Sequence, residues 1–192
     1  MARPPENQAV FFELDGVVVH DLSIRDGERL NYYDGALEAL SRIDPRRFIL
    51  FVASNRQDIA FGALSERDFK RFCTQFLVDA QAMGIEIRKF YTCPYHPKGK
   101  TRFRKDSVFR KPAPGIFKMA QQEFDLNLNR CWMIGHTTTD VLAASRANVG
   151  TIMVETGEGG RDGTYIVDPH FTEPDIRAAI SRILSFEQAL RV

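Results

Sequence analysis

The stretch Ala9-Val10-Phe11-Phe12-Glu13-Leu14-Asp15-Gly16 decides the fold. An apolar run with two aromatic side chains ends at two acidic residues that a single leucine separates. A short run of this kind favours a strand that is buried on both faces, as in a parallel sheet. Ligands of open parallel sheets bind beyond the carboxyl ends of the strands, so Glu13 and Asp15 stand where a site is expected.

Downstream of this strand, short apolar runs alternate with segments of helical periodicity. Further strands are predicted at 48–53, 85–91, 131–134 and 151–154, with a weak one at 164–167. Helices are predicted at 33–43, 65–84, 114–124, 140–147 and 173–190. This alternation predicts an α/β fold of three layers, with a mostly parallel central sheet covered on both faces. The segment after Asp15 and the loop after Tyr91 are short, which predicts a minimal cap over the site.

Length and composition are those of one soluble domain. The 192 residues suit a single unit, 1–192, with residues 1–8 as a flexible N-terminus. The net charge of +1 gives no indication of a nucleic-acid or membrane partner. The N-terminus lacks the apolar core of a signal peptide, and Cys73, Cys93 and Cys131 are widely spaced. We therefore expect reduced thiols and a cytoplasmic protein.

Polar residues that could do chemistry follow three of these strands, and two more precede the helix predicted at 114–124. They are Glu13 and Asp15, Ser54 and Asn55, Arg110 and Lys111, and His136 and Asp140. Carboxylates can hold Mg²⁺, whereas hydroxyl, amide and ammonium groups can hold the oxygens of a phosphoryl group. Each pair alone has a plain explanation, such as a turn after a strand or an acid at a helix N-terminus. Their shared order along the sheet favours one phosphate site.

Four stretches resemble the haloacid-dehalogenase superfamily, and within it the heptose 1,7-bisphosphate and histidinol-phosphate phosphatases. Residues 52–62, VASNRQDIAFG, resemble the V-T-N-Q-S-G-I-A-R-G of those enzymes. Residues 91–99 resemble Y-Y-C-P-H-H-P-x-G, residues 109–115 resemble C-R-K-P-x-P-G, and residues 147–151 match A-N-V-G-T. The resemblance implies a Rossmann-like fold and a phosphatase of small phosphorylated metabolites.

The resemblance also implies roles for the residues of the site. Glu13 stands at the position of the nucleophile, Asp15 at that of the general acid and base, and Lys111 beside both. The implied phosphate-binding residues are Ser54, Asn55, Arg110 and Lys111. The implied metal ligands are Glu13, Asp15, His136 and Asp140, and the implied ion is Mg²⁺.

Two of these positions depart from the pattern of that superfamily. Glu13 replaces an aspartate, which moves the attacking oxygen by up to about 1.5 Å, and a shift near 1 Å can cost about 100-fold in rate. His136 replaces another aspartate, and imidazole suits a transition metal better than Mg²⁺. His136 could also pair with Glu13, Asp15 or Asp140 in place of a metal. The zinc motif of some relatives is broken at Tyr95, which predicts no structural zinc.

Three functions stay open at this point. The first is a catalytically impaired phosphatase that keeps a phosphate-binding pocket. The second is an active phosphomonoesterase on a small phosphorylated sugar or metabolite, with a transition metal as an option. The third is a structural or regulatory subunit that binds a protein partner through exposed aromatic residues, with Phe61, Phe103 and Phe109 as candidates.

Overall fold

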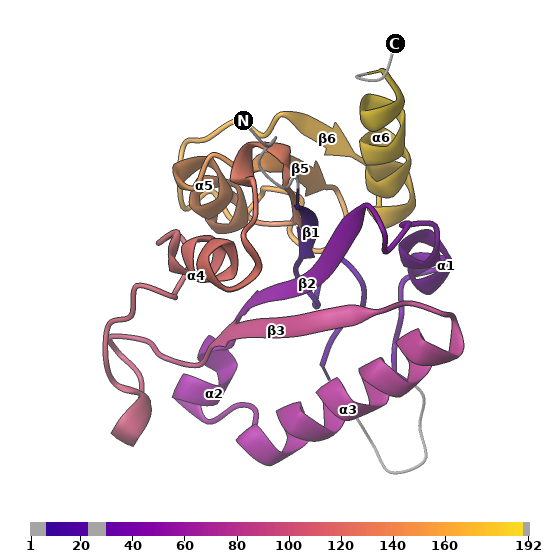
Figure 1. The fold of residues 1–192 in the computed structure, drawn as a ribbon. Helices are drawn as coiled ribbons and strands as arrows, with labels where there is room; N and C mark the ends of the chain where they lie inside the picture. The colour runs from indigo at the N-terminus through magenta and orange to yellow at the C-terminus, as the bar shows by residue number, and fades with distance from the viewer. Residues whose placement is uncertain (1–6, 23–29, 190–192) are drawn as a thin grey trace.

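The computed structural model describes residues 7–22 and 30–189, which form a three-layered α/β fold (Figure 1). The central sheet has the order β3-β2-β1-β4-β5-β6, and every neighbouring pair is parallel. The strands are β1 (Gln8–Phe12), β2 (Phe48–Asn55), β3 (Ile87–Cys93), β4 (Trp132–Gly135), β5 (Gly150–Val154) and β6 (Phe171–Glu173). The predicted α/β class and parallel sheet are confirmed.

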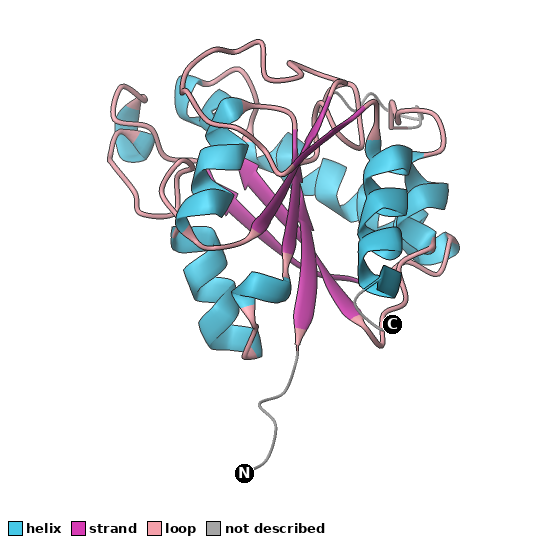
Figure 2. Ribbon diagram, turned by 90° about the horizontal axis from the view of Figure 1, so that it is seen from above, coloured by secondary structure: helices cyan, strands magenta, loops and turns pink. Residues whose placement is uncertain are grey.

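A layer of helices covers each face of the sheet (Figure 2). The helices α1 (Ala36–Ser41), α3 (Glu66–Ala82) and α6 (Ile176–Ala189) pack against one face. The opposite face is covered by α4 (Gly115–Phe124) and α5 (Thr138–Arg146). The short elements are α2 (Gln57–Phe61) and the 3₁₀ helices η1 (Thr101–Phe103) and η2 (Leu128–Arg130).

The apolar run of β1 divides its side chains between two cores. Val10 and Phe12 join the core beneath α1, α3 and α6, whereas Ala9 and Phe11 join the core beneath α4 and α5. Successive side chains of a strand point to opposite faces of the sheet, so a central strand needs apolar residues at every position. The four residues 9–12 are fully buried for this reason.

The order in which strands are added to the sheet reverses between β1 and β4. From β1 the strand order runs outward through β2 and β3 on one side, and through β4, β5 and β6 on the other. Phe12 lies in register with Val52 of β2 and with Ile134 of β4. The residues that follow these three strands therefore meet at one edge of the sheet, at the crevice where such folds bind ligands.

The last strand and the ends of the chain differ from the predictions. Residues 164–167 form no strand, because Ile166 is fully exposed and its apolar side chain packs against nothing. The sixth strand is instead β6, whose Phe171 packs on Trp132 with ring centroids 5.9 Å apart. The predicted flexible N-terminus is wrong at Gln8, which is buried in β1; residues 1–6 lie outside the described part of the chain.

Capping residues set the helix starts. The predicted N-cap Ser65 is confirmed, because its hydroxyl accepts a hydrogen bond from the Asp68 amide at 3.0 Å. Helix α5 starts at Thr138, two residues before the predicted start, because Thr137 caps it and Asp140 completes the capping box. The last helix starts at Ile176 rather than at residue 173. The minimal cap stays a prediction, because residues 23–29 lie outside the described part.

Truncation of Phe117 tests the core beneath α4. Its ring is fully buried, and its centroid lies 5.0 Å from that of Phe11. We expect Phe117→Ala to lower the free energy of unfolding by about 3–5 kcal/mol, measured by urea denaturation. The control Val78→Ala removes a 55% exposed side chain from α3, and its effect should stay within about 0.5 kcal/mol. Equal effects of the two substitutions would contradict this packing.

Candidate active site

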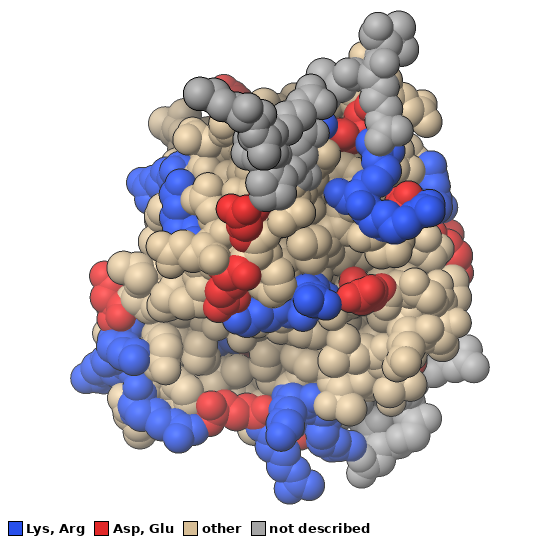
Figure 3. All heavy atoms as spheres, viewed as in Figure 1, with Lys and Arg blue, Asp and Glu red and all other residues tan. Residues whose placement is uncertain are grey.

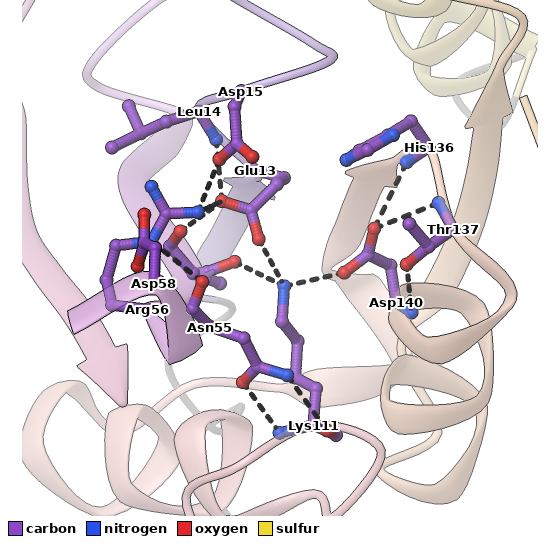
Figure 4. A network of polar contacts seen from close by, with 12 residues as sticks. Glu13, Leu14, Asp15, Asn55, Arg56, Asp58, Lys111, His136, Thr137 and Asp140 are labelled. Carbon is purple, nitrogen blue, oxygen red and sulfur yellow. Dashed lines mark hydrogen bonds and ion pairs between the residues drawn. The ribbon is translucent and has the colours of Figure 1, made fainter. Parts of the chain in front are cut away.

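A buried lysine joins the elements of the site. The ammonium group of Lys111 donates to Glu13 Oε2 at 2.9 Å, to Asp140 Oδ1 at 2.6 Å and to the main-chain oxygen of Ala53 at 2.7 Å (Figure 4). Lys111 is fully buried. Burial disfavours its charged form, but the Asp140 and Glu13 carboxylates outweigh this and raise the pKa of Lys111. The ammonium therefore stays charged, and the carboxylates of Glu13 and Asp140 lie on either side of it.

Glu13 follows β1 and receives donors on both carboxylate oxygens. Oε1 accepts from the Leu14 amide at 2.9 Å and from the Ser54 hydroxyl, and Oε2 accepts from Lys111. The side chain is 4% exposed. Burial raises the pKa of Glu13 above its ordinary value, and the Lys111 charge offsets part of this rise. The carboxylate is thus fixed by its neighbours at the floor of the site.

Asp140 lies in the first turn of α5, opposite Glu13. Its Oδ2 accepts from the main-chain amides of His136 and Thr137, both at 3.1 Å. Burial alone would raise the pKa of Asp140, but the Lys111 charge, the nearby His136 and hydrogen bonds with Lys111 and Thr137 lower it. Gly135 makes this approach possible, because a Cβ atom there would lie 2.4 Å from that of Asp140.

Arg56 was missed by the sequence analysis. Its guanidinium Nη2 lies 2.5 Å from Asp15 Oδ1 and 3.9 Å from Glu13 Oε1, and the residue is 4% exposed. Ser54 and Asn55 end β2, and Arg56 is the next residue. Because ligands of such sheets bind beyond the carboxyl ends of the strands, the position of Arg56 also indicated a site residue. Arg56 therefore brings a second buried cation to the carboxylates.

Two of the predicted phosphate-binding residues, Ser54 and Asn55, already have partners within the protein. Ser54 is fully buried and donates to Glu13. The side-chain amide of Asn55 donates to the Lys111 carbonyl at 2.9 Å and accepts from the Lys111 amide at 3.0 Å. Asn55 thus fastens the backbone of the segment that carries the lysine. Contact of Ser54, Asn55 and Arg110 with phosphate stays a prediction.

His136 does not pair with the acids through its ring. Its Nδ1 accepts from the Glu158 amide at 3.0 Å, and the ring fits between Gly16 and Gly157. An acceptor Nδ1 places the proton of a neutral ring on Nε2. It is the main-chain amide of His136, not the imidazole, that binds Asp140. The expected pairing of the ring with Glu13, Asp15 or Asp140 is therefore wrong.

A divalent cation needs several ligand oxygens that converge on one point. Here Glu13 and Asp140 converge on the Lys111 ammonium, and Asp15 pairs with Arg56. Within residues 7–22 and 30–189, no three His, Cys, Asp or Glu side chains are grouped so that they could hold a metal ion. In this arrangement the carboxylates face protein cations rather than one common metal position.

A cavity of 300 Å³ opens above this network. Six residues predicted for the site line it, namely Glu13, Asp15, Asn55, Arg110, His136 and Asp140. Ser54 and Lys111 lie fully buried and support these residues from within the protein. The cavity is also lined by Arg56, Gln57, Asp58, Thr137 and Thr139, which the sequence analysis did not single out. A volume of this size suits a small phosphorylated metabolite.

The surface gives limited support to a protein-binding role. Phe61 is 38% exposed, whereas Phe103 and Phe109 are half-buried and Phe109 packs against the core beneath α4. Acidic and basic side chains are interspersed over the described face in Figure 3. No helix within the described ranges has the length and apolar character needed to cross a membrane. A subunit role stays a prediction.

Comparisons with known proteins identify relatives of this chain. Residues 108–179 match the model of a family described as HAD-hydrolase-like. A D-glycero-alpha-D-manno-heptose-1,7-bisphosphate 7-phosphatase of Burkholderia mallei is 33% identical over 151 residues, which cover 78% of this chain and 80% of that protein. The corresponding enzyme of Campylobacter jejuni is 31% identical over 161 residues, with 83% and 88% covered.

A solved structure shares the fold. It is the D,D-heptose 1,7-bisphosphate phosphatase from B. bronchiseptica complexed with magnesium and phosphate. The TM-score is 0.78 at 20% sequence identity, and the match covers 94% of this chain and 99% of that one.

Removal of the Asp140 charge tests the buried network. We expect Asp140→Asn to lower the free energy of unfolding at pH 7 by about 3–5 kcal/mol, because Lys111 loses a buried partner. The pKa of Asp140 is below its ordinary value of 3.8, so its contribution is complete above that value and is lost as the pH falls further. The difference between the two proteins should therefore shrink below about pH 4.

Urea denaturation at pH 7 and at lower pH measures this difference, with Asp168→Asn, a substitution of an exposed residue, as control. A difference that does not change with pH would show that Asp140 acts through packing rather than through its charge.

Proposed function

This chain belongs to the haloacid-dehalogenase-like hydrolases of the heptose-bisphosphate phosphatase type, and from that premise we propose that it hydrolyses the phosphate ester of a small phosphorylated sugar. The observation that carries the proposal is the carboxylate pair after β1. Glu13 is fixed at the floor of the cavity beside Lys111, and the Asp15 side chain is 37% exposed at its wall. One acid can thus face phosphorus while the other exchanges protons with the ester and with water.

The proposed reaction has two steps. A Glu13 oxygen attacks phosphorus, the bond to the sugar oxygen breaks, and Asp15 gives that oxygen its proton. Asp15 then takes a proton from water, which attacks phosphorus and releases phosphate from Glu13. The Lys111 ammonium, 2.9 Å from Glu13, offsets part of the rise that burial causes in the pKa of Glu13 and stabilises negative charge that develops next to it.

The substrate class follows from the relatives. They are named as phosphatases of D-glycero-manno-heptose-1,7-bisphosphate, which favours an active enzyme over the impaired one. We propose a heptose phosphate or a similar sugar phosphate for this chain. A cavity of 300 Å³ can hold one phosphate group with part of a sugar.

Binding without turnover is a second candidate, supported by the contacts of Glu13. Three donors, from Leu14, Ser54 and Lys111, already occupy its carboxylate oxygens. They leave about one of the four lone-pair positions of the carboxylate, on Oε2, for attack on phosphorus. If these contacts hold that position away from the phosphorus atom, the cavity binds a phosphorylated ligand and does not cleave it.

Phosphate release separates the two candidates. Heptose 1,7-bisphosphate, histidinol phosphate and p-nitrophenyl phosphate would be tested in EDTA and with Mg²⁺ or Mn²⁺. We expect release by the native protein and a loss of about 10²–10⁴-fold in kcat/KM in Asp15→Asn, because the proton donor is removed. Asp44→Asn, a surface change, is the control and should keep its activity. No release from any substrate, together with a rise in Tm on adding heptose phosphate, would instead support binding without turnover.

A further inference from the structure

Arg56 is placed as a fixed cation between the two acids that follow β1. Its Nη2 lies 2.5 Å from Asp15 Oδ1 and 3.9 Å from Glu13 Oε1 (Figure 4). Its Nε donates to the Asn55 carbonyl at 2.7 Å, and its guanidinium carbon lies 5.6 Å from the ring centroid of Phe69. These contacts hold a side chain that is 4% exposed, so the cation belongs to the interior of the site rather than to its rim.

Protein cations accompany the carboxylates of the site. Lys111 lies between Glu13 and Asp140, and Arg56 lies beside Asp15, whose side chain is 37% exposed. Asp58 also lines the cavity, with its Oδ1 3.9 Å from Arg56 Nε, so four carboxylates face the three cations Lys111, Arg56 and Arg110. Buried carboxylates such as Glu13 and Asp140 are stable only where positive charge compensates them. Arg56 provides positive charge at Glu13 and Asp15, which the phosphate must approach.

One donor atom of Arg56 has no hydrogen-bond partner among the described residues. Its Nη1 is buried and lacks a hydrogen-bond partner in the described part of the chain, as does Nε of Arg110. Both residues line the cavity. A buried donor without a partner is costly, and a phosphate oxygen is a partner of matching charge for a guanidinium. The cavity is thus lined by two arginines that each keep one donor atom without a partner in the described part of the chain.

We propose that Arg56 takes the place of a divalent cation in this site, so that the chain binds a phosphate group without a metal ion. The proposal rests on the proposed function in one respect, namely that the cavity accepts phosphate. Its own content is the source of the positive charge, and this can be tested without turnover.

The first measurement is binding of inorganic phosphate by isothermal titration calorimetry, in EDTA and in Mg²⁺ at equal ionic strength. For the native protein we expect dissociation constants that agree within about twofold in the two buffers. Arg56→Gln should bind phosphate about 10- to 100-fold more weakly in EDTA, because a charged hydrogen bond is lost. Mg²⁺ should restore much of the phosphate affinity of Arg56→Gln, because Glu13 and Asp15 lack the arginine cation in this variant and can bind the metal ion.

The second measurement is the Tm of the ligand-free protein during titration with Mg²⁺, with NaCl as the ionic-strength control. We expect no saturable rise for the native protein and a saturable rise, reversed by EDTA, for Arg56→Gln. Arg46→Gln is the matched control, because it removes an exposed arginine that pairs with Asp44 and should behave like the native protein. If Arg56→Gln does not fold, Arg56→Lys takes its place. It keeps the positive charge but lacks the paired N–H donors of a guanidinium, and it should bind phosphate more weakly than the native protein in EDTA.

The outcomes separate this inference from the proposed function. Saturable Mg²⁺ binding by the native protein, or phosphate binding that requires Mg²⁺, would overturn the role of Arg56 even if the protein is a phosphatase. Metal-independent phosphate binding without release from any ester would support the role of Arg56 and contradict the proposed hydrolysis. If phosphate binds in neither buffer, the cavity is not a phosphate site, and the proposed role of Arg56 is wrong.

Discussion

The buried ammonium of Lys111 is the interaction on which the site depends. It binds Glu13 after β1, the Ala53 carbonyl near the end of β2, and Asp140 at the start of α5. An unpaired ammonium in the interior would cost several kcal/mol, and so would either carboxylate alone. The three groups therefore stabilise one another only as a set. This mutual dependence holds the ends of β1, β2 and α5 at fixed separations.

The backbone around the lysine is held just as firmly. Asn55 forms two hydrogen bonds with the main chain of Lys111, and Gly135 leaves room for Asp140 to approach β4. Residues that a sequence motif assigns to ligand binding here position the residues that carry charge. Such support matters in catalysis, because a displacement near 1 Å can cost about 100-fold in rate. A motif residue can thus be essential without contact to the ligand.

The sequence predicts the scaffold better than the contacts at the site. Runs such as Phe48–Ala53 are apolar throughout because both faces of a central strand are buried, and this leaves a clear signal. The same logic places Glu13 and Asp15 just after β1, and Asp140 on the helix that follows β4. It does not predict that Arg56 turns inward, because the direction of a long side chain depends on the charges around it. The strand β6 was missed because three residues carry too little periodicity.

One guanidinium links binding to chemistry in this site. Arg56 is the partner of Asp15, and a phosphate that enters the cavity is a second anion for the same group. The proposed role of Arg56 lets the phosphate share this positive charge while Asp15 keeps its hydrogen bond to Nη2. The carboxyl of Asp15 and the phosphate are then held next to each other by one rigid group. The cation that binds the substrate would in this way also position the acid that acts on it.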